Sequence, residues 1–261
     1  MPDNTNDAYA PIEIANKVET IGVAKATLPA HRLLALGILA GAFIALGGAF
    51  YTLTITGANM GFGPTRLLSG VAFSLGLILV LVAGAELFTG NNLIVMAWAE
   101  GKISSAQLLR NWGIVYVANF VGSVGIALLM YWSGVLEIGG GGMAKTASAI
   151  AAGKIDLSFS EAFVRGILCN ILVCLAIWLC LAAHSVIGKI FAIIFPVSAF
   201  VALGFEHSIA NMYLIPMGVL SGLEGVTLMD MLGNLVPVTL GNIVGGSGFV
   251  ALGYWLIYLR K

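Results

Sequence analysis

Charge is what this sequence has least of. Only 9% of its 261 residues are charged and 59% are hydrophobic, whereas an average soluble domain carries roughly 25% charged residues. So few charged side chains could not cover the surface of a soluble protein of this size. The net charge of zero also leaves no excess of basic residues that would attract nucleic acid. The composition therefore predicts a protein surrounded by membrane lipid.

Enzyme and metal signatures are missing as well. The sequence has no HExxH pair, no nucleophile elbow and no Walker loop, and its His and Cys residues never come together at metal-ligand spacing. Cys169, Cys174 and Cys180 fall in one apolar stretch, as small buried residues do, and do not suggest a disulfide framework. The alternating short strands of a membrane barrel are absent too. We expect a helical protein that is not an enzyme and needs no cofactor or metal.

Long apolar stretches are abundant by contrast. Each is long enough to cross a hydrocarbon core of about 30 Å as a helix. The second and the fifth exceed a single crossing and contain glycines, which indicates that their helices are broken. The sequence therefore predicts an all-α protein with six transmembrane helices, over residues 33–55, 68–98, 104–136, 158–183, 189–220 and 235–258.

A polar segment, residues 1–32, precedes these stretches. It lacks the short apolar core and cleavage site of a signal peptide, so we expect it to stay on the mature protein. Ile14, Val18 and Ile21 recur at helical spacing, which predicts a short amphipathic helix at the membrane surface. Residues 33–261 are predicted to form the six-span domain.

Lysines and arginines favour one orientation in the membrane. If both chain termini are cytoplasmic, most of the 12 basic residues lie on the cytoplasmic side. Such an excess of positive charge is typical of cytoplasmic loops. We therefore expect both termini in the cytoplasm and, on the opposite side, Arg66, Lys145, Lys154 and Arg165.

The two halves of the chain repeat one pattern. Glu86 and Asn91 in the second stretch match Glu206 and Asn211 in the fifth, at an offset of 120 residues. Because each half holds an odd number of spans, the halves must be inverted relative to one another, as in many transporters and channels. We expect one repeat over residues 33–136 and the other over residues 158–258. A second match has an offset of 123 residues and pairs Asn111 and Asn119 with Asn234 and Asn242.

Ionisable groups at membrane depth are few. Glu86 and Glu206 are the carboxylates deep within spans, and we expect freed backbone N–H groups of the broken helices to serve them as donors. The alternative is a protonated glutamic acid packed against a neighbouring span. His207 lies beside Glu206 in the fifth stretch, opposite Thr89 in the equivalent segment, which favours a role in a solute pathway. The alternative for His207 is a hydrogen-bonded core residue.

Four sequence elements together resemble the formate/nitrite transporter family, most closely its bacterial formate channels. They are Ala-Glu-Leu-Phe-Thr-Gly-Asn-Asn at 85–92, Val-Ala-Asn-Phe-Val-Gly at 117–122, Gly-Ile-Leu-Cys-Asn at 166–170 and Gly-Phe-Glu-His-Ser-Ile-Ala-Asn-Met-Tyr at 204–213. The resemblance covers residues 30–258. It implies an aquaporin-like protomer without Asn-Pro-Ala boxes, assembled as a homopentamer in the bacterial inner membrane with one pore in each protomer.

The resemblance also implies roles for individual residues. Thr89 and His207 would be the central polar contacts of the pathway, with Asn170 near the histidine. Lys154, in the polar connection between the halves, would draw anions into a vestibule. Independently of the resemblance, the buried carboxylates Glu86 and Glu206, with Asn91 and Asn211, are expected to support the helix breaks. The apolar constrictions would be formed by Phe73, Leu77, Leu87, Phe88, Val173 and Phe200.

A permeation hypothesis follows from both lines of reasoning. Half-helix dipoles at the breaks favour an anion at the midplane. Formate would enter through a basic vestibule, be held by Thr89 and the half-helix amides, and take a proton from or through His207. It would cross either as formate or as formic acid. Nitrite, hydrosulfide and acetate are alternative solutes within the family. A structural membrane protein that transports nothing is the alternative from another class.

Overall fold

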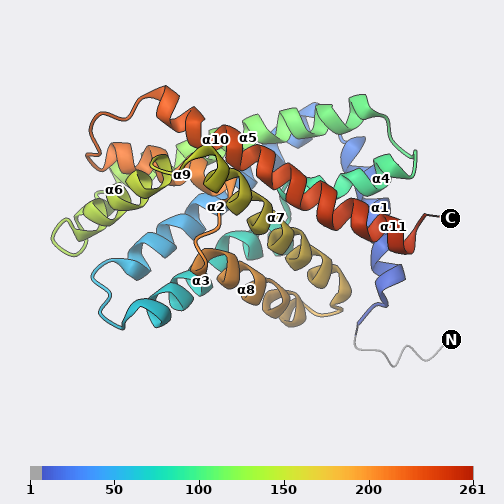
Figure 1. Cartoon of the computed structure of the whole chain (residues 1–261), viewed down its shortest axis with the longest axis horizontal. Helices are drawn as coiled ribbons and strands as arrows, with labels where there is room; N and C mark the ends of the chain where they lie inside the picture. Colours follow the sequence, from blue (N-terminus) through green and yellow to red (C-terminus); the bar gives the residue numbers. More distant parts are fainter. Residues whose placement is uncertain (1–7, 261) are drawn as a thin grey trace.

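The computed structural model describes residues 8–260, and all regular elements in this part of the chain are helices (Figure 1). Residues 1–7 and Lys261 lie outside the described residues. In chain order the elements are α1 (Pro11–Ala26), α2 (Ala30–Ile55), α3 (Phe62–Ile78), the π-helix η1 (Leu79–Gly84), the 3₁₀ helix η2 (Gly90–Ile94), α4 (Val95–Ala99), α5 (Ser105–Trp132), the 3₁₀ helix η3 (Val135–Glu137), α6 (Gly142–Ile155), α7 (Phe159–Ala182), α8 (Val186–Ala202), α9 (Ser208–Leu220), α10 (Leu228–Ile243), the π-helix η4 (Val244–Leu252) and α11 (Gly253–Tyr258).

The predicted six-span architecture is confirmed. Among the described residues, 5 helices are long and apolar enough to cross a membrane: Ala30–Ile55, Phe62–Gly84, Ser105–Trp132, Phe159–Ala182 and Leu228–Tyr258. The shorter apolar helices α8 and α9 together supply the remaining crossing. Helices α1 and α11 lie at one end of the bundle, and α6 lies at the other (Figure 1).

Both predicted helix breaks are present and have the same geometry. The second span is interrupted after Gly84, whose φ is +90°, and the fifth is interrupted after Gly204, whose φ is +73°. A residue with a Cβ adopts such a left-handed conformation only at a cost, so glycine suits both positions. The residue after each glycine donates its backbone N–H to the preceding helical segment, from Ala85 N to Val80 O and from Phe205 N to Phe200 O, both at 2.9 Å.

Close helix contacts hold the two halves in matching shapes. Helix α2 packs against α5 in the first half, and α7 packs against α10 in the second. A Cβ added at Gly122 would lie 2.0 Å from the Ile38 carbonyl oxygen, and one added at Gly241 would lie 2.2 Å from the Phe163 carbonyl oxygen. Small residues let the backbones of two membrane helices approach closely. The resulting van der Waals contacts stabilise the pair, because no hydrophobic effect drives helices together within lipid.

Residues 144–155, expected to be the polar connection between the halves, lie entirely within helix α6. The reason is an apolar face of the helix, on which Met143, Ala147 and Ala151 are buried. This face packs on α9, where a Cβ added at Gly218 would lie 2.2 Å from the Cβ of Ala151. Lys154 therefore sits in the last turn of a helix and not in a loop.

The predicted amphipathic helix is α1, but its apolar face does not rest on lipid alone. Ile14 and Val18 are buried, and the helix packs against η2, α4 and α7. Glu19 is also buried and pairs with Lys102, which follows α4. Helix α1 is thus docked on the bundle.

Two glycines of α5 provide a test of this packing. Gly122→Ala should destabilise the protein by about 1–3 kcal/mol, because the added methyl group would force α2 and α5 apart. Gly125 has nothing within 4 Å of an added Cβ. Gly125→Ala should therefore be neutral or stabilise the helix by about 0.5–1 kcal/mol. Unfolding of both variants in mixed detergent micelles measures the difference, and equal effects would show that the contact is not tight.

Candidate functional site

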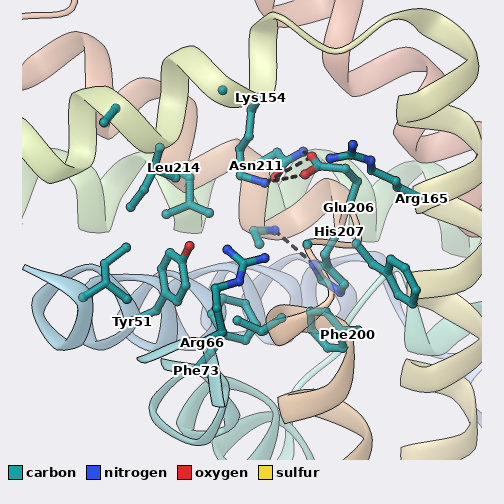
Figure 2. A pocket seen from close by; sticks show the side chains of 18 of the residues that line it. Tyr51, Arg66, Phe73, Lys154, Arg165, Phe200, Glu206, His207, Asn211 and Leu214 are labelled. Carbon is teal, nitrogen blue, oxygen red and sulfur yellow. Dashed lines mark hydrogen bonds and ion pairs between the residues drawn. The ribbon is translucent and has the colours of Figure 1, made fainter. Parts of the chain in front are cut away.

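Two cavities approach the middle of the protein from opposite ends. The first, about 450 Å³, is lined by His207, Phe200 and Phe73 and by residues of α6, and we call it the His207 cavity (Figure 2). The second, about 390 Å³, is lined by Leu87, Leu36 and Val80 and by residues of α1, and we call it the Lys25 cavity. Helix α6 and helix α1 lie at opposite ends of the bundle (Figure 1), so the two cavities that they line lie toward opposite ends of it.

A buried ion pair lines the His207 cavity. Lys154 Nζ lies 2.9 Å and 3.1 Å from the two carboxylate oxygens of Glu206. Asn211 Nδ2 donates to Glu206 Oε2 at 2.6 Å and to Asn234 Oδ1 at 2.7 Å. Asn234 Nδ2 in turn donates to the Lys154 carbonyl oxygen at 2.8 Å, which fixes the end of α6 against this cluster.

The same cluster recurs in the Lys25 cavity. Lys25 Nζ lies 2.8 Å from Glu86 Oε1, and Asn91 Nδ2 donates to Glu86 Oε2 at 2.8 Å and to Asn111 Oδ1 at 2.9 Å. Asn111 Nδ2 donates to the Lys25 carbonyl oxygen at 3.1 Å. Lys25 is therefore the counterpart of Lys154.

The repeated unit is consequently longer than the stretches 33–136 and 158–258. Because Lys25 of α1 corresponds to Lys154 of α6, α1 is the first-half counterpart of α6. The sequence holds one signal for this relation, since the two lysines stand near the ends of helices that precede α2 and α7 respectively.

The donors that serve the buried carboxylates differ from those expected. Lysine and asparagine side chains hold Glu86 and Glu206, and the freed backbone groups are held by two other asparagines. Asn119 accepts a hydrogen bond from Phe88 N at 2.9 Å and donates to the Glu86 carbonyl oxygen at 2.9 Å. In the other half, Asn242 accepts a hydrogen bond from Ser208 N at 2.9 Å and donates to the Glu206 carbonyl oxygen at 3.0 Å. The repeat at an offset of 123 residues identified these two asparagines in the sequence, but it did not predict that they hydrogen-bond the backbone at the breaks.

One polar contact joins the two breaks at the centre. Thr89 Oγ1 lies 2.9 Å from His207 Nε2, and both side chains are buried. His207 Nδ1 accepts a hydrogen bond from Ala210 N at 3.1 Å, as the residue before α9. A neutral imidazole that accepts at Nδ1 carries its proton on Nε2. We therefore assign His207 Nε2 as the donor to Thr89, which leaves the hydroxyl proton of Thr89 available to another acceptor.

Asn170 lies close to this contact and, among the described residues, is hydrogen-bonded to Thr89 rather than to the histidine. Its Nδ2 donates to the Thr89 carbonyl oxygen at 3.2 Å, to Asn92 Oδ1 at 3.1 Å and to the Asn242 carbonyl oxygen at 2.7 Å. Asn170 thereby links the two breaks and positions Thr89.

The residues assigned to the apolar constrictions take different places. Phe73 and Phe200 meet edge to face in the wall of the His207 cavity, with ring centroids 5.8 Å apart. Leu87 lines the Lys25 cavity, at the position that corresponds to His207. Leu77 and Val173 are buried and line neither cavity.

Phe88 is directed elsewhere. Its ring packs edge to face against Tyr116 and Trp112 of α5, at centroid distances of 4.9 Å and 6.0 Å, and it lines neither cavity. Phe88 directly follows Leu87 in the chain, but its side chain points toward α5 whereas that of Leu87 lines the Lys25 cavity.

Lys154 was expected to be a free charge in a vestibule, and the structure corrects this view. Its side chain is 14% exposed and its charge is paired with Glu206. Arg66 and Arg165, which the charge pattern predicted only to lie on the same side of the membrane as Lys154, line the same cavity as Lys154. Lys25, likewise, was not among the residues that the sequence singled out.

Removing one partner of the Lys154–Glu206 pair should be costly. Lys154→Met leaves an unpaired carboxylate, and we expect it to lower the free energy of unfolding by about 3 kcal/mol. The double variant Lys154→Met, Glu206→Gln should recover much of this loss, because Gln keeps the hydrogen bond from Asn211 without the charge. A double-mutant cycle of unfolding in mixed micelles measures the coupling, and additive losses would contradict a buried pair.

Known proteins support this architecture. A family profile described as Formate/nitrite transporter matches residues 12–256. The Formate channel FocA of Escherichia coli is 42% identical over 99% of this chain and 98% of its own length. A probable formate transporter of Methanothermobacter thermautotrophicus is 43% identical over 97% of this chain and 98% of its own length.

Solved structures agree. A structure described as a pentameric formate channel with formate bound has a TM-score of 0.83 at 43% identity, and covers 88% of this chain and 98% of that one. A structure of an FNT family ion channel has a TM-score of 0.85 at 32% identity, over 94% of this chain and 98% of the other. The chain therefore belongs to the formate/nitrite transporter family and is a multi-pass membrane channel, not an enzyme.

Proposed function

We propose that this protein conducts formate, a small monovalent weak-acid anion, across the bacterial inner membrane through a pore in each protomer. The hydrogen bond between Thr89 and His207 is the observation that carries the proposal, because it stands between two cavities that open to opposite ends of the bundle. Relatives over the full length of the chain are named formate channels. Permeation is passive or coupled to a proton.

The central contact gives formate a binding partner. Because the Thr89 hydroxyl oxygen accepts the hydrogen bond from His207 Nε2, its own proton is free to be donated to a carboxylate oxygen. Helix α9 begins next to His207, so its positive end also favours an anion here. Phe73 and Phe200 border this position and disfavour a hydrated charge.

His207 is the side chain through which a proton would reach the solute. A proton added at Nδ1 must displace the hydrogen bond from Ala210 N, so proton uptake requires a local rearrangement at the start of α9. A neutral acid then passes the apolar residues Leu77, Leu87 and Val173 more easily than an anion does. Asn170 holds Thr89 in place through its carbonyl oxygen.

We further infer a homopentamer with both termini in the cytoplasm. A relative with formate bound is described as pentameric. Helices α1 and α11 lie at the same end of the bundle, as an even number of crossings requires (Figure 1). The Lys25 cavity would then face the cytoplasm and the His207 cavity the opposite side, because α1 lines the first and α6 the second.

Nitrite is the principal alternative solute, because it is also a small monovalent oxyanion and the family includes nitrite in its description. Hydrosulfide and acetate are further alternatives. Competition of each anion with labelled formate in proteoliposomes separates these solutes.

The central pair yields a test in proteoliposomes. Thr89→Val should lower formate flux about tenfold, because one hydrogen bond to a charged solute is worth about 1.5–3 kcal/mol. His207→Asn should conduct with a flattened dependence on pH, since asparagine carries no titratable proton to pass to the solute. Asparagine is also a favoured residue before a helix, so α9 should still begin at position 208.

The controls follow from the same geometry. Phe88→Leu, directed toward α5, should leave the formate flux and its pH profile within about twofold. A wild-type pH profile in His207→Asn would remove His207 from the proton step. Undiminished flux in Thr89→Val would contradict the central site.

A further inference from the structure

The two cavities follow one plan but do not carry the same charge. Glu206 N donates to the Arg165 carbonyl oxygen at 3.3 Å, and Glu86 N donates to the Leu36 carbonyl oxygen at 3.2 Å. Arg165 and Leu36 are therefore counterparts in the repeat, and each lines its own cavity. An arginine on one side of the membrane thus corresponds to a leucine on the other.

The charges of the other lining residues cancel. In the Lys25 cavity the lysine is paired with Glu86, and in the His207 cavity Lys154 is paired with Glu206. Of the described residues that line the His207 cavity, Arg66 and Arg165 are the cations left beside that pair. The Lys25 cavity has no such excess among its described lining residues.

Within the described part of the chain, Arg66 is held in position by one hydrogen bond, and the other N–H groups of its guanidinium are free to bind a solute. Its Nε donates to the Ala202 carbonyl oxygen at 2.9 Å, at the end of α8. One terminal nitrogen lies over Gly204, since a Cβ added to that glycine would come within 2.9 Å of it. In Figure 2 the side chain extends from α3 into the cavity, on the side opposite Lys154 and Glu206. Its remaining N–H groups have no hydrogen-bond partner among the described residues and can serve a solute.

Arg165 is tied down only weakly. Its guanidinium lies 3.9 Å from Glu161, too far for a hydrogen bond, and both side chains are about half exposed. Its backbone, by contrast, is fixed by the hydrogen bond from Glu206 N. The break after α8 therefore lies between two arginines, one bonded to Ala202 before it and one bonded to Glu206 within it.

We propose that Arg66 and Arg165 form an outer subsite in the His207 cavity that holds a planar monovalent oxyanion before it reaches Thr89 and His207. The proposal rests on the proposed function and specifies where the anion first binds. A guanidinium matches the two oxygens of a carboxylate better than an ammonium group does. Because both arginines are partly exposed, the anion binds weakly, as a channel requires if the solute is to move on.

The subsite makes the two sides of the channel unequal. The half-saturating formate concentration should be lower when formate approaches through the His207 cavity than through the Lys25 cavity. Net flux still vanishes when the electrochemical potentials are equal, because a passive site changes occupancy and not the equilibrium.

Oriented proteoliposomes test this proposal. An N-terminal affinity tag separates vesicles whose Lys25 cavity faces outward from those whose His207 cavity does, since α1 lines the Lys25 cavity. Initial rates of formate influx are then recorded against external formate at low and at high ionic strength. Arg165→Leu, which installs the residue of the equivalent position, should raise the half-saturating concentration about fivefold for influx through the His207 cavity at low salt. The value for influx through the Lys25 cavity should change by less than about twofold.

Four further variants sharpen the result. Arg66→Met should act like Arg165→Leu, and Arg165→Lys should keep part of the affinity because the charge remains. Leu36→Arg should lower the half-saturating concentration for influx through the Lys25 cavity. Lys145→Gln removes an exposed charge of α6 that does not line the cavity, and should change nothing.

The outcomes separate this proposal from the function it rests on. Absence of formate flux in the wild-type protein would overturn the proposed function. Wild-type flux with the same half-saturating concentration in Arg165→Leu and Arg66→Met would overturn the arginine subsite alone. An equal shift in Lys145→Gln would reduce the effect to general surface charge, and would also overturn the subsite.

Discussion

Two transmembrane helices are interrupted inside the membrane, and the rest of the structure depends on how their free backbone groups are hydrogen-bonded. A backbone that leaves a helix at this depth needs a partner for every freed N–H and carbonyl group, because lipid offers none. Asn119 and Asn242 meet part of that need by bonding to one N–H and one carbonyl group just after the glycine of each break. The glycines at Gly84 and Gly204 supply the backbone conformation. Close packing of α2 on α5 and of α7 on α10 then brings the asparagines to the breaks.

The buried carboxylates connect the breaks to the peripheral helices. Glu86 requires Lys25, so α1 must dock on the bundle, and Glu206 requires Lys154, so α6 must do the same. An ion pair in a largely apolar setting contributes less to stability than its geometry suggests, because both groups lose their hydration. Its main effect here is to specify which helices close the two cavities. The charges of these pairs cancel, which leaves the solute pathway to be set by other residues.

The pathway depends on where the two halves differ. His207 occupies the position that Leu87 holds in the other half, and Arg165 the position that Leu36 holds. A symmetric pair of leucines would give an apolar barrier with nothing to bind an anion. Thr89 of the first half and His207 of the second form the central polar contact, and the arginine at position 165, where the other half has Leu36, adds positive charge to one cavity alone. The repeat therefore supplies the helices and breaks that both halves share, and the positions at which the halves differ supply the polar and charged side chains of the cavities.

The sequence by itself determined the six spans, the two breaks and the inverted repeat, because span length, glycine placement and residue spacing are local properties of the chain. It also brought Thr89 and His207 to notice, since both stand beside the repeated Glu and Asn positions. Only the tertiary structure decided that Lys154 is paired, that Lys25 is its counterpart, that Phe88 faces α5 and that Arg66 and Arg165 share a cavity. These facts depend on side-chain direction and on contacts between residues far apart in sequence, such as Arg66 and Ala202. Helical spacing alone does not encode them.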